Sequence, residues 1–339
     1  MRVSIFNLFF YLFFIIPGIA FSQQSFSSNP LFGGWYADPD AVVIGNQLWI
    51  YPTFSARYDR QVFFDAFSTD DLVHWKKHPR ILDTSAIKWA KRAMWAPGIV
   101  QKGKQYFLFF SANDIQSAAR KNSNGKHPDA VDDTLGGIGI AVSDNPGGPF
   151  RDYLGKPLIN QYHNNAQPID QSVFQDKDGR YYIIYGGWGR CNIAKLNHDF
   201  TALEPFQNGK LVQEITPEGY VEGPVMFTKN EKYYLMWSEG NWTDSSYKVA
   251  YAIADAVTGP FIKKTTILKA DNGVATGAGH HSIFNLPDSD EWYIVYHRRP
   301  IPNSDRDHRV VCMDRLYFNK DGTIRDVVMT NKGVEKRKL

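Results

Sequence analysis

Three acidic residues and one histidine occupy corresponding places in a repeated sequence pattern. Each copy of the pattern contains small residues, a short apolar segment, a polar turn and a second apolar segment. Four copies begin with Asp38, Asp170, Glu222 and His280, and a fifth has Ala96 at that place. Acids that lie far apart in the chain but come together in the fold can divide the work of proton donor and proton acceptor.

The repeat predicts an all-β protein. Copies recur roughly every 50 to 75 residues, near the repeat length of a β-propeller blade. Each copy predicts two strands, and a second pair of short strands follows, with Gly- and Asp-containing turns between them. We therefore expect a five-bladed β-propeller with four antiparallel strands per blade. Corresponding positions of successive blades then meet at the central channel, which brings the acids together. The expected strand pairs span 38–51, 96–110, 170–185, 222–240 and 280–296.

Length and composition fit this fold. The chain has 339 residues, a net charge of +3 and 15% aromatic residues. We attribute most of the aromatic excess to strand packing, and the rest to a cleft where rings stack on sugars. No basic cluster of the size that nucleic acid requires is present. We expect residues 23–339 to form a single propeller domain and the protein to be a monomer.

The first 22 residues have the features of a signal peptide. Arg2 precedes an apolar run over 5–16, and Ala20 and Ser22 supply small residues before a cleavage site. The alternative is an N-terminal membrane anchor, for which the apolar run is short. Nothing later in the chain is long and apolar enough to cross a bilayer. We therefore expect a secreted or periplasmic protein that has no membrane contact after signal cleavage.

Three other features concern the body of the chain. Cys191 and Cys312 lie in apolar, strand-like runs, and we expect free buried thiols rather than a disulfide. The polar segment 112–136 predicts a rim loop near the pocket. Residues 84–91 have the one helix-like apolar pattern in the chain.

The acids suit hydrolysis of a glycosidic bond. One carboxylic acid protonates the departing oxygen, and one carboxylate activates water or attacks the sugar. A third acid keeps the pKa of the proton donor high, because like charges close together disfavour double ionisation. Taken singly, each acid is more typical of a turn cap. Their recurrence at one repeat position favours the catalytic interpretation.

The motifs that contain these residues resemble those of glycoside hydrolase family 43. The resemblance covers about residues 30–330. It implies a five-bladed propeller and an inverting enzyme that acts on arabinose- or xylose-containing glycans without a cofactor for the chemistry. The motifs are Ala37-Asp38-Pro39-Asp40-Ala41, Met94-Trp95-Ala96-Pro97, Ile169-Asp170-Gln171-Ser172, Val221-Glu222-Gly223-Pro224 and Gly279-His280-His281-Ser282.

The resemblance assigns roles to four of the residues. It implies that Asp38 is the general base, that Glu222 is the general acid and that Asp170 orients Glu222 and modulates its pKa. Arg309 matches an arginine that contacts the substrate. One departure is visible: Gln171 stands where the family usually has proline, which puts the local backbone in question.

Further binding residues are expected around this set. His280 matches a histidine that helps to hold a central ion, such as a structural calcium, although the adjacent His281 leaves the choice of histidine open. Trp35 and Trp95 flank the first two copies, and we expect them to be walls of a sugar subsite, with core packing as the alternative.

We therefore expect a secreted inverting glycoside hydrolase that releases a pentose, most simply α-L-arabinofuranose, from plant-type polysaccharides or oligosaccharides. A β-xylosidase or a galactan-cleaving enzyme of the same family is the alternative. A propeller that binds sugar without cutting it is a rival from another class. A fructan-cleaving enzyme that retains configuration is less consistent with the sequence, since Ala37 precedes Asp38 where such enzymes have asparagine.

Overall fold

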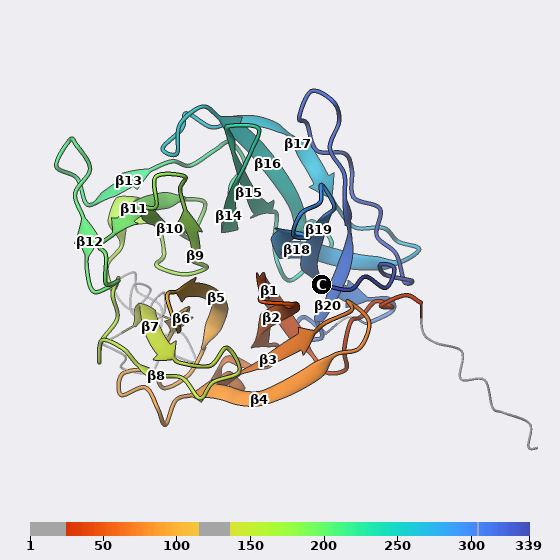
Figure 1. The fold of residues 1–339 in the computed structure, drawn as a ribbon, viewed down its shortest axis with the longest axis horizontal. Helices are drawn as coiled ribbons and strands as arrows, with labels where there is room; N and C mark the ends of the chain where they lie inside the picture. The colour runs from red at the N-terminus through yellow and green to blue at the C-terminus, as the bar shows by residue number, and fades with distance from the viewer. Residues whose placement is uncertain (1–24, 115–135, 304) are drawn as a thin grey trace, which may run out of the picture.

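The computed structural model describes residues 25–114, 136–303 and 305–339. In these residues, five antiparallel sheets surround a common axis (Figure 1), which confirms the predicted five-bladed propeller. The predicted signal peptide and residues 115–135 of the predicted rim loop lie outside the described residues. None of the helices in the described part of the chain has the length and apolar character needed to cross a membrane.

The strands follow the chain order blade by blade, and the first strand of each blade lies nearest the axis (Figure 1). The first blade contains β1 (Tyr36–Ile44), β2 (Gln47–Phe54), β3 (Phe63–Thr69) and β4 (Lys76–Asp83). The second contains β5 (Trp95–Lys102), β6 (Gln105–Ala112), β7 (Gly137–Ser143) and β8 (Arg151–Asp152). The third contains β9 (Ser172–Gln175), β10 (Tyr181–Tyr185), β11 (Asn192–Leu196), β12 (Leu203–Glu204) and β13 (Val212–Glu214). The fourth contains β14 (Glu222–Lys229), β15 (Lys232–Glu239), β16 (Lys248–Ala254) and β17 (Ile262–Leu268). The fifth contains β18 (Ala275–Asn285), β19 (Trp292–Pro300) and β20 (Val310–Leu316).

Two blades differ from the predicted four strands. In the third blade, β12 and β13 both pair with β11. The fifth blade has only three strands among the described residues, and the expected fourth strand at 324–328 does not form. That segment instead follows the outer edge of the fourth blade, where the Val327 amide donates to the Ile267 carbonyl at 2.7 Å. The helix-like segment 84–91 also forms no helix.

The N-terminal segment completes the fifth blade. The Leu31 amide donates to the Val311 carbonyl of β20 at 2.9 Å, and the Ser27 amide donates to the Val334 carbonyl at 2.8 Å. The side-chain amide of Asn29 donates to both the Met313 carbonyl and the Asp314 carboxylate. Segments from both ends of the chain thus cover the exposed edge of β20, which closes the ring and protects an unpaired strand.

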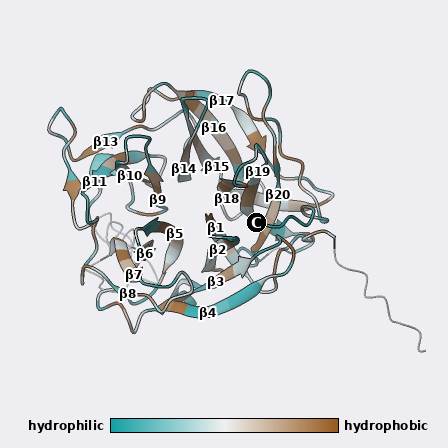
Figure 2. Cartoon of the chain, viewed as in Figure 1, coloured by the Kyte–Doolittle hydropathy of each residue, from teal (hydrophilic) through white to brown (hydrophobic). Residues whose placement is uncertain are grey.

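Hydrophobic cores lie between adjacent blades. One cluster packs Trp49 and Phe64 of the first blade against Leu108 and Phe110 of the second, and corresponding clusters occur at the other blade interfaces, including the interface of the fifth blade with the first. Outer strands are more polar, as β4 shows in Figure 2. Most of the largest fully buried side chains are tyrosine or phenylalanine, so strand packing accounts for much of the aromatic excess.

Both cysteines belong to these cores. Cys191 and Cys312 are buried and free, as predicted. Burial raises the pKa of the Cys312 thiol to about 12, so it stays protonated at neutral pH.

Candidate active site

Bulges near the start of four of the five innermost strands shape the centre of the propeller. Pairing of β1 with β2 shifts between Ala37 and Asp40, and similar shifts interrupt β5, β14 and β18. Each blade has one residue here in the left-handed region, a conformation that re-aims the backbone at bulges. These residues are Asp38 (φ 48°), Ala96 (45°), Asp170 (55°), Gly223 (62°) and His280 (36°).

The bulges correct the predicted repeat alignment. The left-handed position of the fourth blade is Gly223, so Glu222 lies one residue before the position that Asp38 and Asp170 occupy. Its ladder partner Ser238 corresponds to Thr53, the partner of Ala37. The alignment matched acid to acid, whereas the backbone places glycine, the residue that best tolerates positive φ, at the bulge. Glu222 still reaches the centre, with a side chain one methylene longer than aspartate.

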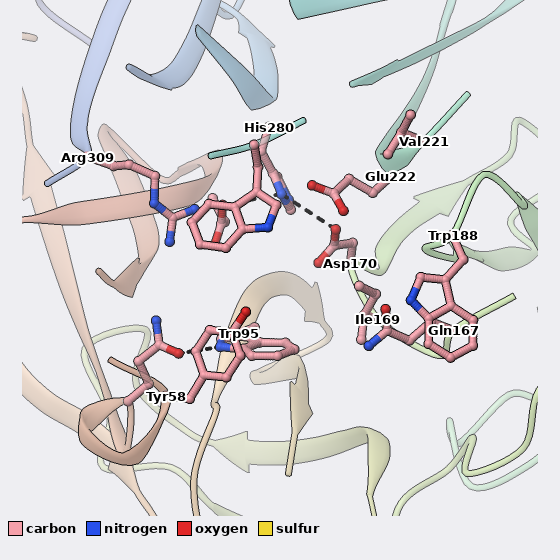
Figure 3. A pocket seen from close by; sticks show the side chains of 13 residues that line it. Tyr58, Trp95, Gln167, Ile169, Asp170, Trp188, Val221, Glu222, His280 and Arg309 are labelled. Carbon is pink, nitrogen blue, oxygen red and sulfur yellow. Dashed lines mark hydrogen bonds and ion pairs between the residues drawn. The ribbon is translucent and has the colours of Figure 1, made fainter. Parts of the chain in front are cut away.

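The innermost strands and their loops enclose a cavity of about 270 Å³. This volume is slightly below the roughly 300–1,000 Å³ of most small-molecule pockets, so it suits a ligand the size of one sugar ring. Seven polar or charged residues and six aromatic or aliphatic residues line it, and Figure 3 draws their side chains. The lining residues are Asp38, Tyr58, Gln61, Trp95, Gln167, Ile169, Asp170, Trp188, Val221, Glu222, Trp242, His280 and Arg309.

Asp38 is held as a carboxylate. Its Oδ1 lies 3.2 Å from Nη1 of Arg309, 3.3 Å from Nδ1 of His280 and 3.2 Å from Nδ1 of His297. Burial by itself raises the pKa of Asp38, but Arg309 and the two histidines outweigh burial and lower that pKa well below its ordinary value. Asp38 is therefore ionised throughout the neutral and mildly acidic range.

Asp170 and Glu222, unlike Asp38, tend to stay protonated. Figure 3 shows their carboxyl groups and the His280 ring directed toward one another. Burial raises the pKa of Asp170 well above its ordinary value, and the negative charges of Glu222 and Asp38 add to the effect. Burial raises the pKa of Glu222 to about 7; a hydrogen bond from Tyr247 opposes this shift and Asp38 favours it. The site thus contains an ionised carboxylate and a pair of acids that retain a proton near neutral pH.

The residue before Gln171 keeps the conformation of its counterparts, which answers the question raised by the missing proline. Asp170 has the left-handed φ of its counterparts. Nε2 of the Gln171 side chain donates to the Ala96 carbonyl, and its Oε1 accepts from the Ser111 hydroxyl at 2.9 Å. The side chain thereby ties the third blade to the bulge of the second.

His280, and not His281, faces the cavity. Nδ1 of His280 lies 3.3 Å from Oδ1 of Asp38 and 3.8 Å from Oδ2 of Asp170, and the His280 amide donates to the Ser238 hydroxyl at 2.8 Å. His281 is buried beside it, and burial lowers its pKa to about 3, so it is neutral.

The surroundings of His280 give no support to the expected calcium site. Calcium prefers six to eight oxygen ligands. In the described part of the chain, no group of three or more His, Cys, Asp or Glu side chains is arranged to hold a metal ion. The Arg309 guanidinium also brings a positive charge to the same carboxylate. The central ion therefore stays a prediction, and His280 is better described as a partner of the acids.

The other predicted binding residues separate into two groups. Arg309 and Trp95 line the cavity; Nε of Arg309 donates to the Ser55 hydroxyl at 3.0 Å, and the Trp95 indole donates to Gln61. Trp35 is not among the lining residues. Its ring stacks on His308 with centroids 4.2 Å apart, a position that does not support a role as a wall of the cavity.

Sequence reasoning missed several aromatic lining residues. Trp242 lies under the guanidinium of Arg309, 4.9 Å from centroid to Cζ. Trp188 stacks on Tyr162 with centroids 5.3 Å apart, and Tyr58 packs edge-on against Trp95 at 4.8 Å. None of the three occupies a repeated position; the one local signal is the unusual Gly186-Gly187-Trp188-Gly189 run.

Comparison with known proteins agrees with this geometry. The chain is 44% identical to a β-D-galactofuranosidase from Aspergillus niger, over 92% of this chain and 88% of that protein. It is 28% identical to a xylosidase/arabinosidase from Bacteroides ovatus, over 86% of this chain and 94% of that protein. Among solved structures, an α-L-arabinofuranosidase from Clostridium thermocellum is 30% identical with a TM-score of 0.68, and the match covers 88% of this chain and 95% of that one.

A thermostable family 43 glycoside hydrolase has a TM-score of 0.73 at 25% identity, with 91% of this chain and 97% of that one covered. The family model for glycosyl hydrolases family 43 matches residues 27–324, nearly the whole described chain. The five blades and the central acids follow one another along the chain in the same order as the family motifs in the sequence. The chain therefore belongs to glycosyl hydrolases family 43.

Proposed function

We propose that this protein hydrolyses the glycosidic bond of a terminal furanosyl residue with inversion at the anomeric carbon. The observation that carries the proposal is the opposite protonation of two carboxyl groups in one cavity. Asp38 is ionised beside Arg309, whereas burial raises the pKa of Glu222 to about 7. Hydrolysis of a glycosidic bond needs this pairing of a charged carboxylate and a protonated acid, and the resemblance to the family supports inversion.

In the proposed reaction, Asp38 accepts a proton from a water molecule as the water oxygen bonds to the anomeric carbon. The bond between that carbon and the leaving oxygen breaks, and Glu222 gives its proton to the leaving oxygen. Asp170 and Glu222 are coupled: burial and the Glu222 charge disfavour ionisation of Asp170, so the pair retains a proton. Arg309 keeps Asp38 ionised and lies where it can contact the sugar.

A terminal β-D-galactofuranosyl residue is the leading candidate substrate, because the 44% identical relative is a β-D-galactofuranosidase. The α-L-arabinofuranosyl residue expected from the sequence is the second candidate, supported by the arabinofuranosidase of similar structure. The two sugars share their ring configuration and differ by one hydroxymethyl carbon on the exocyclic chain. A cavity of about 270 Å³ suits either ring at the end of a glycan.

The test is hydrolysis of matched 4-nitrophenyl glycosides: β-D-galactofuranoside, α-L-arabinofuranoside and β-D-xylopyranoside. We expect the highest kcat/KM on one of the two furanosides. Proton NMR of the first-formed sugar should show the inverted anomer, and Glu222→Gln from the same preparation is the control for contaminating enzymes. Preference for the xyloside would replace the furanoside proposal by a β-xylosidase, and sugar binding without hydrolysis would indicate a non-catalytic propeller.

We further propose that the protein is exported and acts as a monomer. The features of residues 1–22 support export, since they match a cleavable signal peptide. N-terminal sequencing of the protein recovered outside the cytoplasm should begin at Gln23, and light scattering should give the mass of one chain.

A further inference from the structure

Tyr247 contacts the proposed general acid. Its hydroxyl donates a hydrogen bond of 2.8 Å to Oε1 of Glu222, and its side chain is fully buried. Gly279 borders the ring so closely that a Cβ at this position would overlap it. The backbone at Gly279 therefore confines the phenol on one side, while its hydroxyl holds Glu222.

The same ring also packs on His297. The Tyr247 and His297 rings are stacked, with centroids 5.6 Å apart and planes at 13°. His297 lies on β19 and is fully buried. Its Nδ1 is 3.2 Å from both Oδ1 and the backbone nitrogen of Asp38. One stacked pair of rings thus contacts the acid at one end and the base at the other.

We propose that Tyr247 and His297 form a positioning pair that holds Glu222 and Asp38 at the spacing needed for one water and one glycosidic bond. The inference rests on the proposed inverting reaction. In that reaction the two carboxyl groups must stay roughly 6.5–9.5 Å apart to admit the water. An error of about 1 Å in such a geometry can cost about 100-fold in rate. Neither ring lines the cavity, so both act through the carboxyl groups.

Several other charged or titratable groups also surround Glu222, and any pH effect must be separated from theirs. They are Asp38, Asp170, Arg309, His280, Tyr58 and Tyr220. Tyr247→Phe changes none of these groups, so a shift of the pH profile in that variant can be assigned to the lost hydroxyl.

The main test is Tyr247→Phe, which keeps the stacked ring and removes the hydroxyl. We expect kcat to fall by about tenfold or more with little change in KM. The basic limb of the pH profile should move to higher pH, because the lost hydrogen bond favoured ionised Glu222. Tyr251→Phe is the matched control: Tyr251 is fully buried on β16, and its hydroxyl accepts from the Ile324 amide at 2.9 Å, away from the cavity. The control should leave both limbs in place.

A second variant tests the link between the rings. His297→Asn removes the stack and should lower kcat, and the acidic limb should move to higher pH because a partner of Asp38 is lost. In the double variant the loss should be smaller than the product of the single losses, since both act through one unit. Fully multiplicative losses, or a Tyr247→Phe variant that behaves like Tyr251→Phe, would overturn the positioning pair. Glu222→Gln is assayed in parallel: if it keeps full activity, the proposed function itself fails.

Discussion

Nη1 of Arg309 lies 3.2 Å from Oδ1 of Asp38, and both residues are buried. Arg309 is thus the fixed positive charge in a cavity that also holds Asp170 and Glu222. A buried carboxylate is costly without such a partner. The ion pair with Arg309 keeps Asp38, the base, charged, whereas Glu222, the acid, must carry a proton.

Replacement of Arg309 by methionine should therefore raise the pKa of Asp38 and shift the acidic limb of the pH profile to higher pH. We expect kcat/KM to fall by about tenfold or more, equivalent to about 1.4 kcal/mol. Arg306→Met is the control, since the Arg306 guanidinium lies 5.0 Å from the Trp242 ring but makes no ion pair with Asp38. Equal shifts of the acidic limb in both variants would contradict a specific role for Arg309.

Glu222→Gln should remove proton donation to the leaving oxygen. On 4-nitrophenyl or natural glycosides the rate should fall by about 10²- to 10⁴-fold. The loss should be much smaller on 2,4-dinitrophenyl glycosides, whose leaving group needs no proton. Kinetics on a leaving-group series measure this difference, and an equal loss across the series would exclude Glu222 as the acid.

The same variant should change stability in a pH-dependent way. The pKa of Glu222 is about 7 in the fold against an ordinary value of 4.5. Between these values the folded chain holds a proton that the unfolded chain has released, so this group lowers stability as pH rises. Glu222→Gln should therefore gain stability relative to wild type at pH 8, on the order of 2–3 kcal/mol, and lose that advantage at pH 4. Urea unfolding at both pH values tests the difference; a gap independent of pH contradicts it.

Asp170→Asn should lower the pKa of Glu222, because one carboxyl group that shares its proton and repels its charge is gone. The basic limb should then move to lower pH, while the acidic limb, which reports Asp38, stays nearly fixed. The pH dependence of kcat/KM measures both limbs. Movement of the acidic limb instead would exchange the roles assigned to Asp170 and Asp38.

Asp38→Asn should abolish turnover while keeping the backbone. Asp38 has a φ of 48°, and asparagine is among the residues that best tolerate this left-handed region. Azide should partly restore the rate on activated glycosides and yield a glycosyl azide of inverted configuration. NMR of that product checks the assignment, and a product of retained configuration would argue against Asp38 as the base of an inverting enzyme.

The sequence by itself was sufficient for the propeller, the family and the central group of Asp38, Asp170, Glu222, His280 and Arg309. Strand–turn–strand units are encoded locally, by alternating apolar residues and turn residues. Once five such units are recognised, rotation about the channel brings their corresponding positions together.

Only the tertiary structure decided the features that depend on contacts between distant segments. Gly223, rather than Glu222, takes the bulge position, because backbone conformation and not side-chain chemistry sets the register. Trp242 and Trp188 reach the cavity from loops outside the repeat, and Tyr247 meets His297 across two blades. Packing between blades determines these contacts. No periodic sequence pattern encodes them, so only the tertiary structure reveals them.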